Sequence, residues 1–332
     1  MRLRRNRRPR RGVALLAALW LVVAIATVAL QFSLEARERR NVGILASERG
    51  IQRAAALGAL AVMQARLEQA ARLGPSADAN PQLARLRATD PWFGADSVFS
   101  GPVMVDSMEV DVQVHDLGEK LNINRMSEIQ LQQFFSFLTS DFSLSTHLSQ
   151  AIMDWRDADS TQRPNGAERD GYIKAEMLAL PTNAPFREIE ELQNVMGMTP
   201  EVYAAASPYL TTHGQIGQVN LNSAPIAVLR ALPGMTDVTL NLILQMRSGG
   251  QRINSVAQLF GGAQTGPQRG GGRAGQLGGA AVQNQLQAVA TTTTTEIELL
   301  ITARTGPQAQ PSRLIAILRR VGNNATIESK QW

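Results

Sequence analysis

Residues 12–30 read GVALLAALWLVVAIATVAL and decide how the rest of the chain is organised. The eighteen residues from Val13 to Leu30 carry no charge, and the twelve residues before them include seven arginines and no acid. At 1.5 Å per residue, a helix over this segment is about 27 Å long, close to the ~30 Å hydrocarbon core of a bilayer. Because basic flanks stay cytoplasmic, the sequence predicts a membrane segment with the rest of the chain on the far side.

Three kinds of signal fit this segment. A cleaved secretory signal is one, since Thr27 and Ala29 form a small-residue cleavage site, and an uncleaved signal anchor is another. The third is a type IV prepilin signal, in which a basic leader ending in glycine is removed and the apolar helix is retained. Arg11-Gly12 followed by Val13 resembles that signal. It predicts processing after Gly12 and a mature chain that starts at Val13.

The leader also accounts for the basic charge of the chain. The full sequence has 33 basic and 28 acidic residues, a net of +5, but removing residues 1–12 leaves 26 basic against 28 acidic residues, a net of −2. The charge is therefore no argument for a nucleic-acid partner. There is no cysteine, which excludes disulfides, a thiolate nucleophile and cysteine-ligated metals. The three histidines, His115, His147 and His213, are scattered singly and do not indicate a metal site.

The predicted helix continues beyond the apolar segment. Residues 31–72 contain no proline, and apolar side chains recur at helical spacing between Leu57 and Leu67. Gly74-Pro75 then ends the pattern. The sequence predicts one long helix, half in the bilayer and half amphipathic outside it. A short anchor followed by a helical hairpin is the alternative, with breaks at the internal glycines Gly43, Gly50 and Gly58.

Farther along, the period of the apolar residues changes to that of a strand. Residues 110–115 alternate between valine and polar side chains, as in a strand with one buried face. Residues 116–119 have the composition of a turn. Residues 296–301 alternate in the same way, and 314–321 form another β-rich stretch. We expect these two later segments to form a hairpin that completes the sheet begun at 110.

Two stretches about ninety residues apart resemble each other. Residues 121–124 read LNIN and lead into helical residues that end at Arg156, and residues 219–222 read VNLN and lead into helical residues that end at Arg247. The natural N-cap residues are Asn124 in the first stretch and Asn222 or Ser223 in the second. The sequence predicts two helix-turn-helix units of SAM or helix-hairpin-helix type.

The turn Leu232-Pro233-Gly234 brings a second class of function into consideration. Helix-hairpin-helix units bind DNA backbones through a glycine-rich hairpin and basic side chains. Here Asp237 stands where a phosphate would approach, and Arg230 and Arg247 are too few to supply several phosphate contacts. We expect a packing module, and keep a membrane-anchored DNA-binding or DNA-uptake protein as the alternative.

The first unit contains the richest group of polar residues, DWRDAD at 154–159 and NGAERDGY at 165–172. Counted from Asp157 as the first position of an EF-hand loop, oxygen-bearing residues fall at five of its ligand positions. Gln162 stands where that loop needs glycine, so the match is partial. The predicted calcium ligands are Asp154, Asp157, Asp159, Glu168 and Asp170.

Two other interpretations of this acidic loop exist. It is either a solvated loop in which Asp154 or Asp157 pairs with Arg156 or Arg169, or an enzymatic pair of carboxylates. Five uncompensated carboxylates in one loop repel one another, which favours a bound cation. Nothing nearby supplies a nucleophile or an oxyanion site, so we expect no enzyme activity.

These motifs together resemble the general secretion pathway protein K family, the large minor pseudopilin of type II secretion systems. The resemblance covers the leader through about Leu259 and returns in the final strands. The motifs that carry it are HDLG at 115–118, LNIN at 121–124, DWRD at 154–157, NGAE at 165–168, NAPF at 183–186, EL at 191–192, MGM at 196–198 and VNLNSA at 219–224.

The resemblance implies a non-enzymatic protein at the tip of a periplasmic pseudopilus, anchored by a single pass in the bacterial inner membrane with its C-terminal domain in the periplasm. The implied partners are the minor pseudopilins I and J, other pseudopilins, the prepilin peptidase and the inner-membrane assembly platform, with no nucleic acid. It implies cleavage after Gly12, N-methylation of Val13 and calcium in the acidic loop. Most pilins carry Glu at the fifth mature position, where this chain has Ala17, as fits the family. A subunit without that carboxylate seeks no partner ahead of it.

The expected fold class is α+β, a pilin-like long N-terminal helix on a small antiparallel sheet, with a large all-α insertion. Between Gly261 and Gly279 nine glycines stand among polar residues without an apolar period, which is typical of a flexible linker. The expected segments are a cleaved leader (1–12), the N-terminal helix (13–75), the first part of the head (76–120), a first helical domain with the acidic loop (121–218), a second helical unit (219–260), a glycine-rich flexible loop (261–288) and a C-terminal hairpin (289–332).

Overall fold

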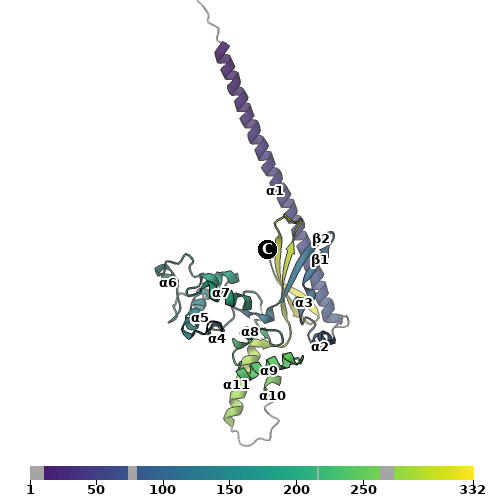
Figure 1. Ribbon diagram of the computed structural model, residues 1–332, viewed down its shortest axis with the longest axis vertical. Coiled ribbons are helices and arrows are strands. Elements are labelled where there is room, and N and C mark those ends of the chain that lie inside the picture. The colour runs from purple at the N-terminus through teal and green to yellow at the C-terminus, as the bar shows by residue number, and fades with distance from the viewer. Residues whose placement is uncertain (1–10, 74–80, 215–216, 262–272) are drawn as a thin grey trace, which may run out of the picture.

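A computed structural model describes residues 11–73, 81–214, 217–261 and 273–332. Its longest element is α1 (Arg11–Leu73), which projects far beyond the rest of the molecule (Figure 1). The helix runs unbroken through Gly43, Gly50 and Gly58, so the single-helix prediction is confirmed and the helical hairpin is excluded. Its most apolar eighteen-residue window has a mean hydropathy of 2.4 and none of that window is buried. Residues 1–10 of the predicted leader lie outside the described residues.

The second half of α1 packs on an antiparallel sheet of five strands in the order β1-β2-β7-β8-β9. The core between them joins α1 residues such as Leu60 and Met63 to Val110 and Val112, which are fully buried. Gly58 allows the close approach, because a Cβ there would lie 2.7 Å from Val105 Cγ1. The strands are β1 (Gly101–Val105), β2 (Met108–Asp116), β7 (Glu296–Ala303), β8 (Ser312–Val321) and β9 (Asn324–Gln331).

Three of these strands were predicted and two were not. The alternation at 110–115 forms β2, and the expected hairpin forms β7 and β8, with β7 pairing β2 as predicted. The unpredicted strands β1 and β9 lie at the two edges of the sheet. The head also contains the short helices α2 (Pro81–Thr89) and α3 (Ala95–Phe99), where the sequence predicts only a polar connection.

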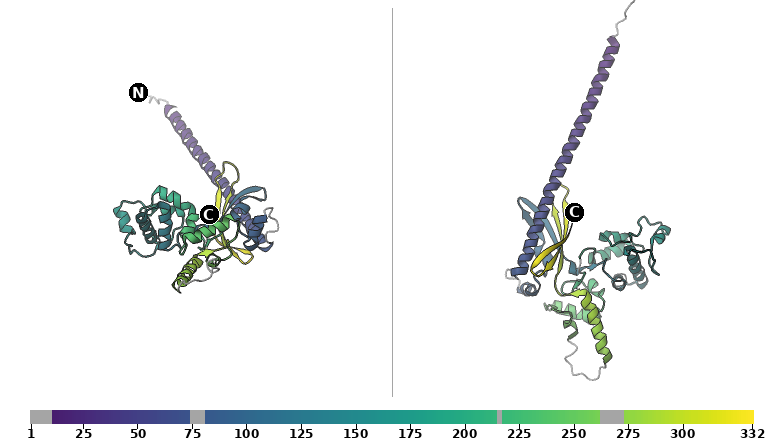
Figure 2. Two further views of the ribbon diagram at one scale, coloured as in Figure 1. Left: turned by 60° about the horizontal axis from the view of Figure 1, so that its bottom comes forward. Right: turned by 180° about the vertical axis from the view of Figure 1, so that it is seen from behind.

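The chain between β2 and β7 forms a helical insertion with its own hydrophobic core. The insertion lies at the end of the sheet opposite the projecting part of α1, as the views in Figures 1 and 2 agree. Its first part holds η1 (Leu117–Glu119), β3 (Leu121–Asn122), α4 (Glu128–Thr139), α5 (Phe142–Arg156), α6 (Arg169–Lys174), η2 (Ile189–Asn194), α7 (Pro200–Ala206), η3 (Ser207–Tyr209) and β4 (Leu210–Thr211). Its second part holds β5 (Val219–Asn220), α8 (Ile226–Arg230), α9 (Asp237–Ser248), α10 (Gln258–Gly261), α11 (Arg273–Val289) and β6 (Ala290–Thr291).

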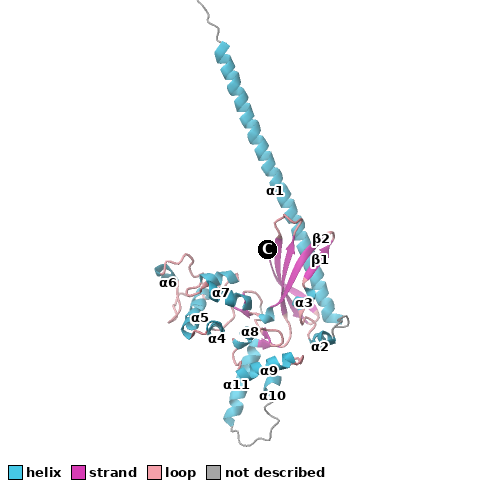
Figure 3. Cartoon of the chain, in the orientation of Figure 1, coloured by secondary structure: helices cyan, strands magenta, loops and turns pink. Residues whose placement is uncertain are grey.

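Figure 3 shows that the described regular elements of this insertion are mostly helices joined by long loops, with four two-residue strands, which agrees with the predicted all-α insertion. Two expectations about it need correction. Residues 273–288 were expected within a flexible loop, but they form most of the helix α11. Leu286 near the end of this helix is fully buried, and this packing favours a helix over a flexible loop. Residues 262–272 of that loop lie outside the described residues. The expected N-caps are also wrong. Ser127 caps α4 and Pro225 precedes α8. Asn124 and Asn222 instead hydrogen-bond the backbone of Phe186 and of Ile253.

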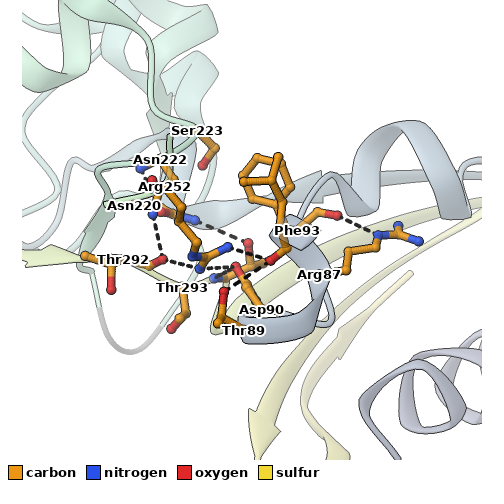
Figure 4. A network of polar contacts seen from close by, with 12 residues as sticks. Arg87, Thr89, Asp90, Phe93, Asn220, Asn222, Ser223, Arg252, Thr292 and Thr293 are labelled. Carbon is orange, nitrogen blue, oxygen red and sulfur yellow. Dashed lines mark hydrogen bonds and ion pairs between the residues drawn. The ribbon is translucent and has the colours of Figure 1, made fainter. Parts of the chain in front are cut away.

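A buried carboxylate joins the insertion to the head (Figure 4). Asp90, just after α2, is fully buried, and its Oδ2 lies 3.4 Å from Arg252 Nη2 of the insertion. Its Oδ1 lies 3.2 Å from Arg320 Nη1 in β8, and its Oδ2 accepts a hydrogen bond from Thr294 N at 2.8 Å. Buried charges are stable only when paired, so these contacts fix where the insertion sits on the sheet.

Candidate functional site

The acidic loop starts at the end of α5 and returns to α6. Asp154 lies on the last turn of α5 and is fully buried, and Asp157 is the C-cap residue of that helix. Arg163 and Gly166 form a tight turn, in which Gly166 N donates to Arg163 O at 3.0 Å. Glu168 occupies the N-cap position of α6, yet its side chain makes no cap hydrogen bond. Its carboxylate is therefore available to the loop.

Three carboxylates of this loop converge. One oxygen from each of Asp157, Asp159 and Glu168 lies within 4.8 Å of the others. Glu168 is only 6% exposed, and neither of its oxygens accepts a hydrogen bond from any described residue. Asp157 Oδ1 is likewise buried and without a hydrogen bond within the described chain. Burying acceptors without partners costs about 1–3 kcal/mol each, and more for charged groups, so a compensating cation is expected.

A second, separate contact uses Arg163. Its Nη1 lies 2.5 Å from Asp154 Oδ1 and 2.6 Å from Asp157 Oδ2, and its backbone N donates to Asp154 Oδ2 at 3.2 Å. The solvated-loop interpretation expected Arg156 or Arg169 as the partner of these acids, and the structure uses Arg163 instead. Arg156 donates to the backbone carbonyls of Ile123 and Met126.

The electrostatics of the cluster reflect its burial. Burial raises the pKa of Glu168 above its ordinary value, and the negative charges of Asp154 and Asp157 raise it further. Burial also raises the pKa of Asp154, although the hydrogen bonds from Arg163 oppose the shift. In both residues burial is the main cause, because it disfavours the charged form of a carboxyl.

The predicted ligands thus fall into three groups. Asp157, Asp159 and Glu168 come together, and Asp154 is held by Arg163. Asp170 is exposed in the first turn of α6 and lies outside the converging group. The assignment of all five residues to one metal ion stays a prediction.

The residues present fit a hard divalent cation. Carboxylate oxygens from a flexible loop are the ligands that calcium prefers. Gly166 leaves the necessary space, because a Cβ at this position would collide with Asp154 Oδ2. A bound ion would supply charge compensation and tie α5 to α6, through Asp157 and Asp159 on one side and Glu168 on the other.

The hairpin of the second unit does not present a DNA-binding surface. Gly234, at φ +78°, faces α11, since a Cβ there would lie 2.6 Å from Val282 O. Asp237 pairs with Arg230 at 3.1 Å, and Arg247 donates to the backbone carbonyls of Leu221 and Ala224. Gly234 and Arg247 therefore pack within the insertion, and Arg230 is paired with Asp237 at the surface.

The predicted processing residues lie at the start of α1. Gly12 and Val13 are the second and third residues of that helix. Ala17 follows on the same helix and is exposed.

Comparisons with known proteins agree on one family. A family model described as "Type II secretion system (T2SS), protein K" matches residues 114–214, which contain the acidic loop. The type II secretion system protein K of Pectobacterium carotovorum subsp. carotovorum is 27% identical over 219 residues, covering 60% of this chain and 62% of that protein. The protein of the same name from Dickeya chrysanthemi is 29% identical over 128 residues, covering 35% of this chain and 33% of that protein. Both matches span less than two thirds of the relative's length.

The fold also matches a solved structure, the GspK-GspI-GspJ complex from the type 2 secretion system of enterotoxigenic Escherichia coli. The match has a TM-score of 0.51 at 17% sequence identity and covers 86% of this chain and 97% of the matched chain. In fold and in sequence, most directly over residues 114–214, the chain is thus similar to the type II secretion system protein K family.

Proposed function

We propose that this chain is a minor pseudopilin that caps the tip of a type II secretion pseudopilus and helps to start its assembly. The observation that carries the proposal is the position of the insertion, at the end of the head opposite the apolar part of α1 (Figure 1). Pilin-like subunits stack along parallel N-terminal helices, so a bulky domain at the far end leaves no room for a subunit above. Ala17 supports this position, because it offers no carboxylate to a subunit ahead.

The location and partners follow from the same proposal. The apolar half of α1 anchors the chain in the inner membrane, and the head and insertion stand in the periplasm. The solved structure with the matching fold is a complex of GspK with GspI and GspJ, which supports the minor pseudopilins I and J as partners at the tip. The prepilin peptidase, which cuts after Gly12, the remaining pseudopilins and the assembly platform complete the set. The acidic loop takes calcium as a structural ion.

Removing the insertion tests capping directly. Asp116 of β2 pairs with Ile297 of β7, so a short turn can join these neighbouring strands in place of residues 118–295. We expect the shortened chain to enter pseudopili without ending them, and pseudopili measured by immuno-electron microscopy to become longer. A chain with Asp90→Asn and the insertion intact is the control for weakened contacts between insertion and head. Unchanged pseudopilus length with the shortened, membrane-inserted chain contradicts capping.

Processing has its own test, with a matched glycine as control. Gly12→Ala should leave the chain at full length in cells that contain prepilin peptidase, and secretion should stall. Gly43→Ala lies in the same helix and meets no described atom within 4 Å, so its chain should lose the leader normally. Intact mass measurement distinguishes the two. Mature chains that start near Gln31 show instead that the apolar segment is a cleaved secretory signal.

A further inference from the structure

The proposed calcium site leaves one charged residue of the loop without a role, and this inference rests on that site. Arg163 is 27% exposed at its side chain and makes the shortest charged contacts in the loop. Its Nε also lies 3.8 Å from Glu128 Oε2 on the neighbouring helix α4. A positive charge beside a cation site opposes binding of the cation, so this arginine needs a stabilising role in the loop to be favourable.

Asp154 is fully satisfied by this arginine. Both of its carboxylate oxygens accept from Arg163, one from the guanidinium and one from the backbone N–H. A fully buried carboxylate needs such partners to remain charged. Each oxygen of Asp154 is therefore engaged by Arg163, and the arginine offsets the charge of this carboxylate.

The two carboxylate oxygens of Asp157 lie in different environments. Its Oδ2 lies 2.6 Å from Arg163 Nη1, whereas its Oδ1 is buried without a hydrogen bond from the described chain. The oxygens of Asp159 and Glu168 converge on Asp157, and both oxygens of Glu168 lack a hydrogen-bonding partner among the described residues. Asp157 Oδ1 and both oxygens of Glu168 are thus buried acceptors of the cluster that have no hydrogen bond among the described residues.

We propose that Arg163 is a resident cation next to the metal centre, held by Asp154 and one oxygen of Asp157. A divalent ion then binds the other oxygen of Asp157 together with Asp159 and Glu168, and Asp154 is a positioning residue that acts through Arg163. Arg163 keeps the metal-free loop folded by neutralising Asp154, and it weakens metal binding by its own charge. The loop is in this way tuned to bind calcium reversibly.

Calcium titration of the full chain in detergent, after treatment with a chelator, tests the proposal by calorimetry. Arg163→Gln should bind calcium on the order of tenfold more tightly, because a nearby positive charge is removed. Arg163→Lys keeps that charge and should stay within about threefold of wild type. Arg169→Gln removes the same charge from an exposed neighbour of Glu168 and should change the Kd by less than about threefold.

The acidic residues separate the two roles. Asp157→Asn, Asp159→Asn and Glu168→Gln should each weaken calcium binding by at least about thirtyfold, and Asp154→Asn by less than about tenfold. In metal-free protein, Asp154→Asn and Arg163→Gln should each lower the Tm, and the double variant should lower it by less than the sum of the two. That non-additivity is the sign of a direct pair.

Two results overturn the proposal. If Asp154→Asn abolishes binding as completely as Asp157→Asn, calcium displaces Arg163 and Asp154 is a ligand. If wild type binds calcium and Arg163→Gln binds it no more tightly, the arginine does not oppose the ion. Absence of calcium binding by wild type and by Arg163→Gln alike refutes the calcium site itself, and the metal-free coupling of Asp154 to Arg163 then shows an ion pair with a purely structural role.

Discussion

The two helical units of the insertion share a hydrogen-bonding scheme, and the connection after their second helices differs in length. In the first, Asn124 exchanges two hydrogen bonds with the backbone of Phe186, at 2.9 and 2.8 Å. In the second, Asn222 exchanges two with the backbone of Ile253, both at 2.9 Å. The short strands repeat as well, since β3 pairs β4 and β5 pairs β6, both in parallel.

The arginines that end the second helices also correspond. Arg156 donates to the carbonyls of Ile123 and Met126, and Arg247 donates to those of Leu221 and Ala224. In the first unit, residues 157–185 lie between Arg156 and Phe186. In the second unit, only residues 248–252 lie between Arg247 and Ile253. The acidic loop is therefore an excursion from a scaffold that the second unit builds without it. Its carboxylates are thus additions to the scaffold that the two units share.

The largest expected loss of stability comes from removing the paired hydrogen bonds of Asn124 or Asn222. Asn124→Ala and Asn222→Ala each leave a backbone N–H and C=O of the bonded residue without their partner, which should cost about 3 kcal/mol of unfolding free energy. Asn222→Ala should cost more, because its amide also donates to Thr292 O at 2.8 Å. Chemical denaturation in detergent measures both. If both variants are as stable as wild type, the paired hydrogen bonds of the two asparagines contribute nothing to the shared scheme.

Calcium binding should have an intermediate effect on stability, and it should protect the first helical unit but not the second. Calcium at about a hundred times its Kd stabilises the chain by about 2.7 kcal/mol if it binds only the folded state. Hydrogen exchange should then show slower exchange of the amides at 157–170, with little change at 248–252. Glu168→Gln should abolish that protection, whereas Asp237→Asn, an acid in the second unit, should not. Protection spread equally over both units contradicts a site confined to the acidic loop.

The smallest effect is a dependence of metal-free stability on pH. The pKa of Glu168 is raised above 4.5, mainly by burial and then by Asp154 and Asp157. A carboxyl with a higher pKa in the folded state stabilises the fold when protonated, so its contribution is present below pH 4.5 and is lost as the pH rises through the folded pKa. Burial, then Asp116 and Asp96, raises the pKa of Glu119 to about 7, which adds a slope of the same sign.

Comparing wild type with Glu168→Gln isolates the residue of interest, because Glu119 is present in both. As the pH rises above 4.5, the Tm of metal-free wild type should fall more steeply than that of the variant. Saturating calcium should reverse the sign for wild type, since an ion binds the ionised carboxylates. Parallel Tm profiles for the two proteins without metal show that Glu168 is not the group responsible.

Sequence patterns predicted the parts of this molecule that repeat. The apolar run predicted α1, the alternation at 110–115 predicted β2, and the similar LNIN and VNLN motifs predicted the helices that follow each of them. The edge strands β1 and β9 were missed because Pro102 and the polar residues of 324–331 carry little alternation. Their pairing comes from neighbouring strands, which is a tertiary effect.

The site was predicted less completely than the fold. The spacing of acids identified the loop, but it could not separate Asp154 from Asp157, because that division depends on which way Arg163 folds back. Asn124 and Asn222 fit an N-cap by type, yet they bind backbone groups distant in sequence. The correspondence of Arg156 with Arg247 was the one available signal that Arg156 would not pair with the acids.

The junction at Asp90 has a mechanical consequence. The insertion leaves the sheet through β2 and re-enters through β7, which are neighbours in its centre, and Asp90 joins α2 to Arg252 and to Arg320 of β8. A push along the axis of α1 therefore reaches the insertion through two central strands and a buried charge, not through a flexible tether. A force applied along α1 would therefore move the insertion together with the sheet.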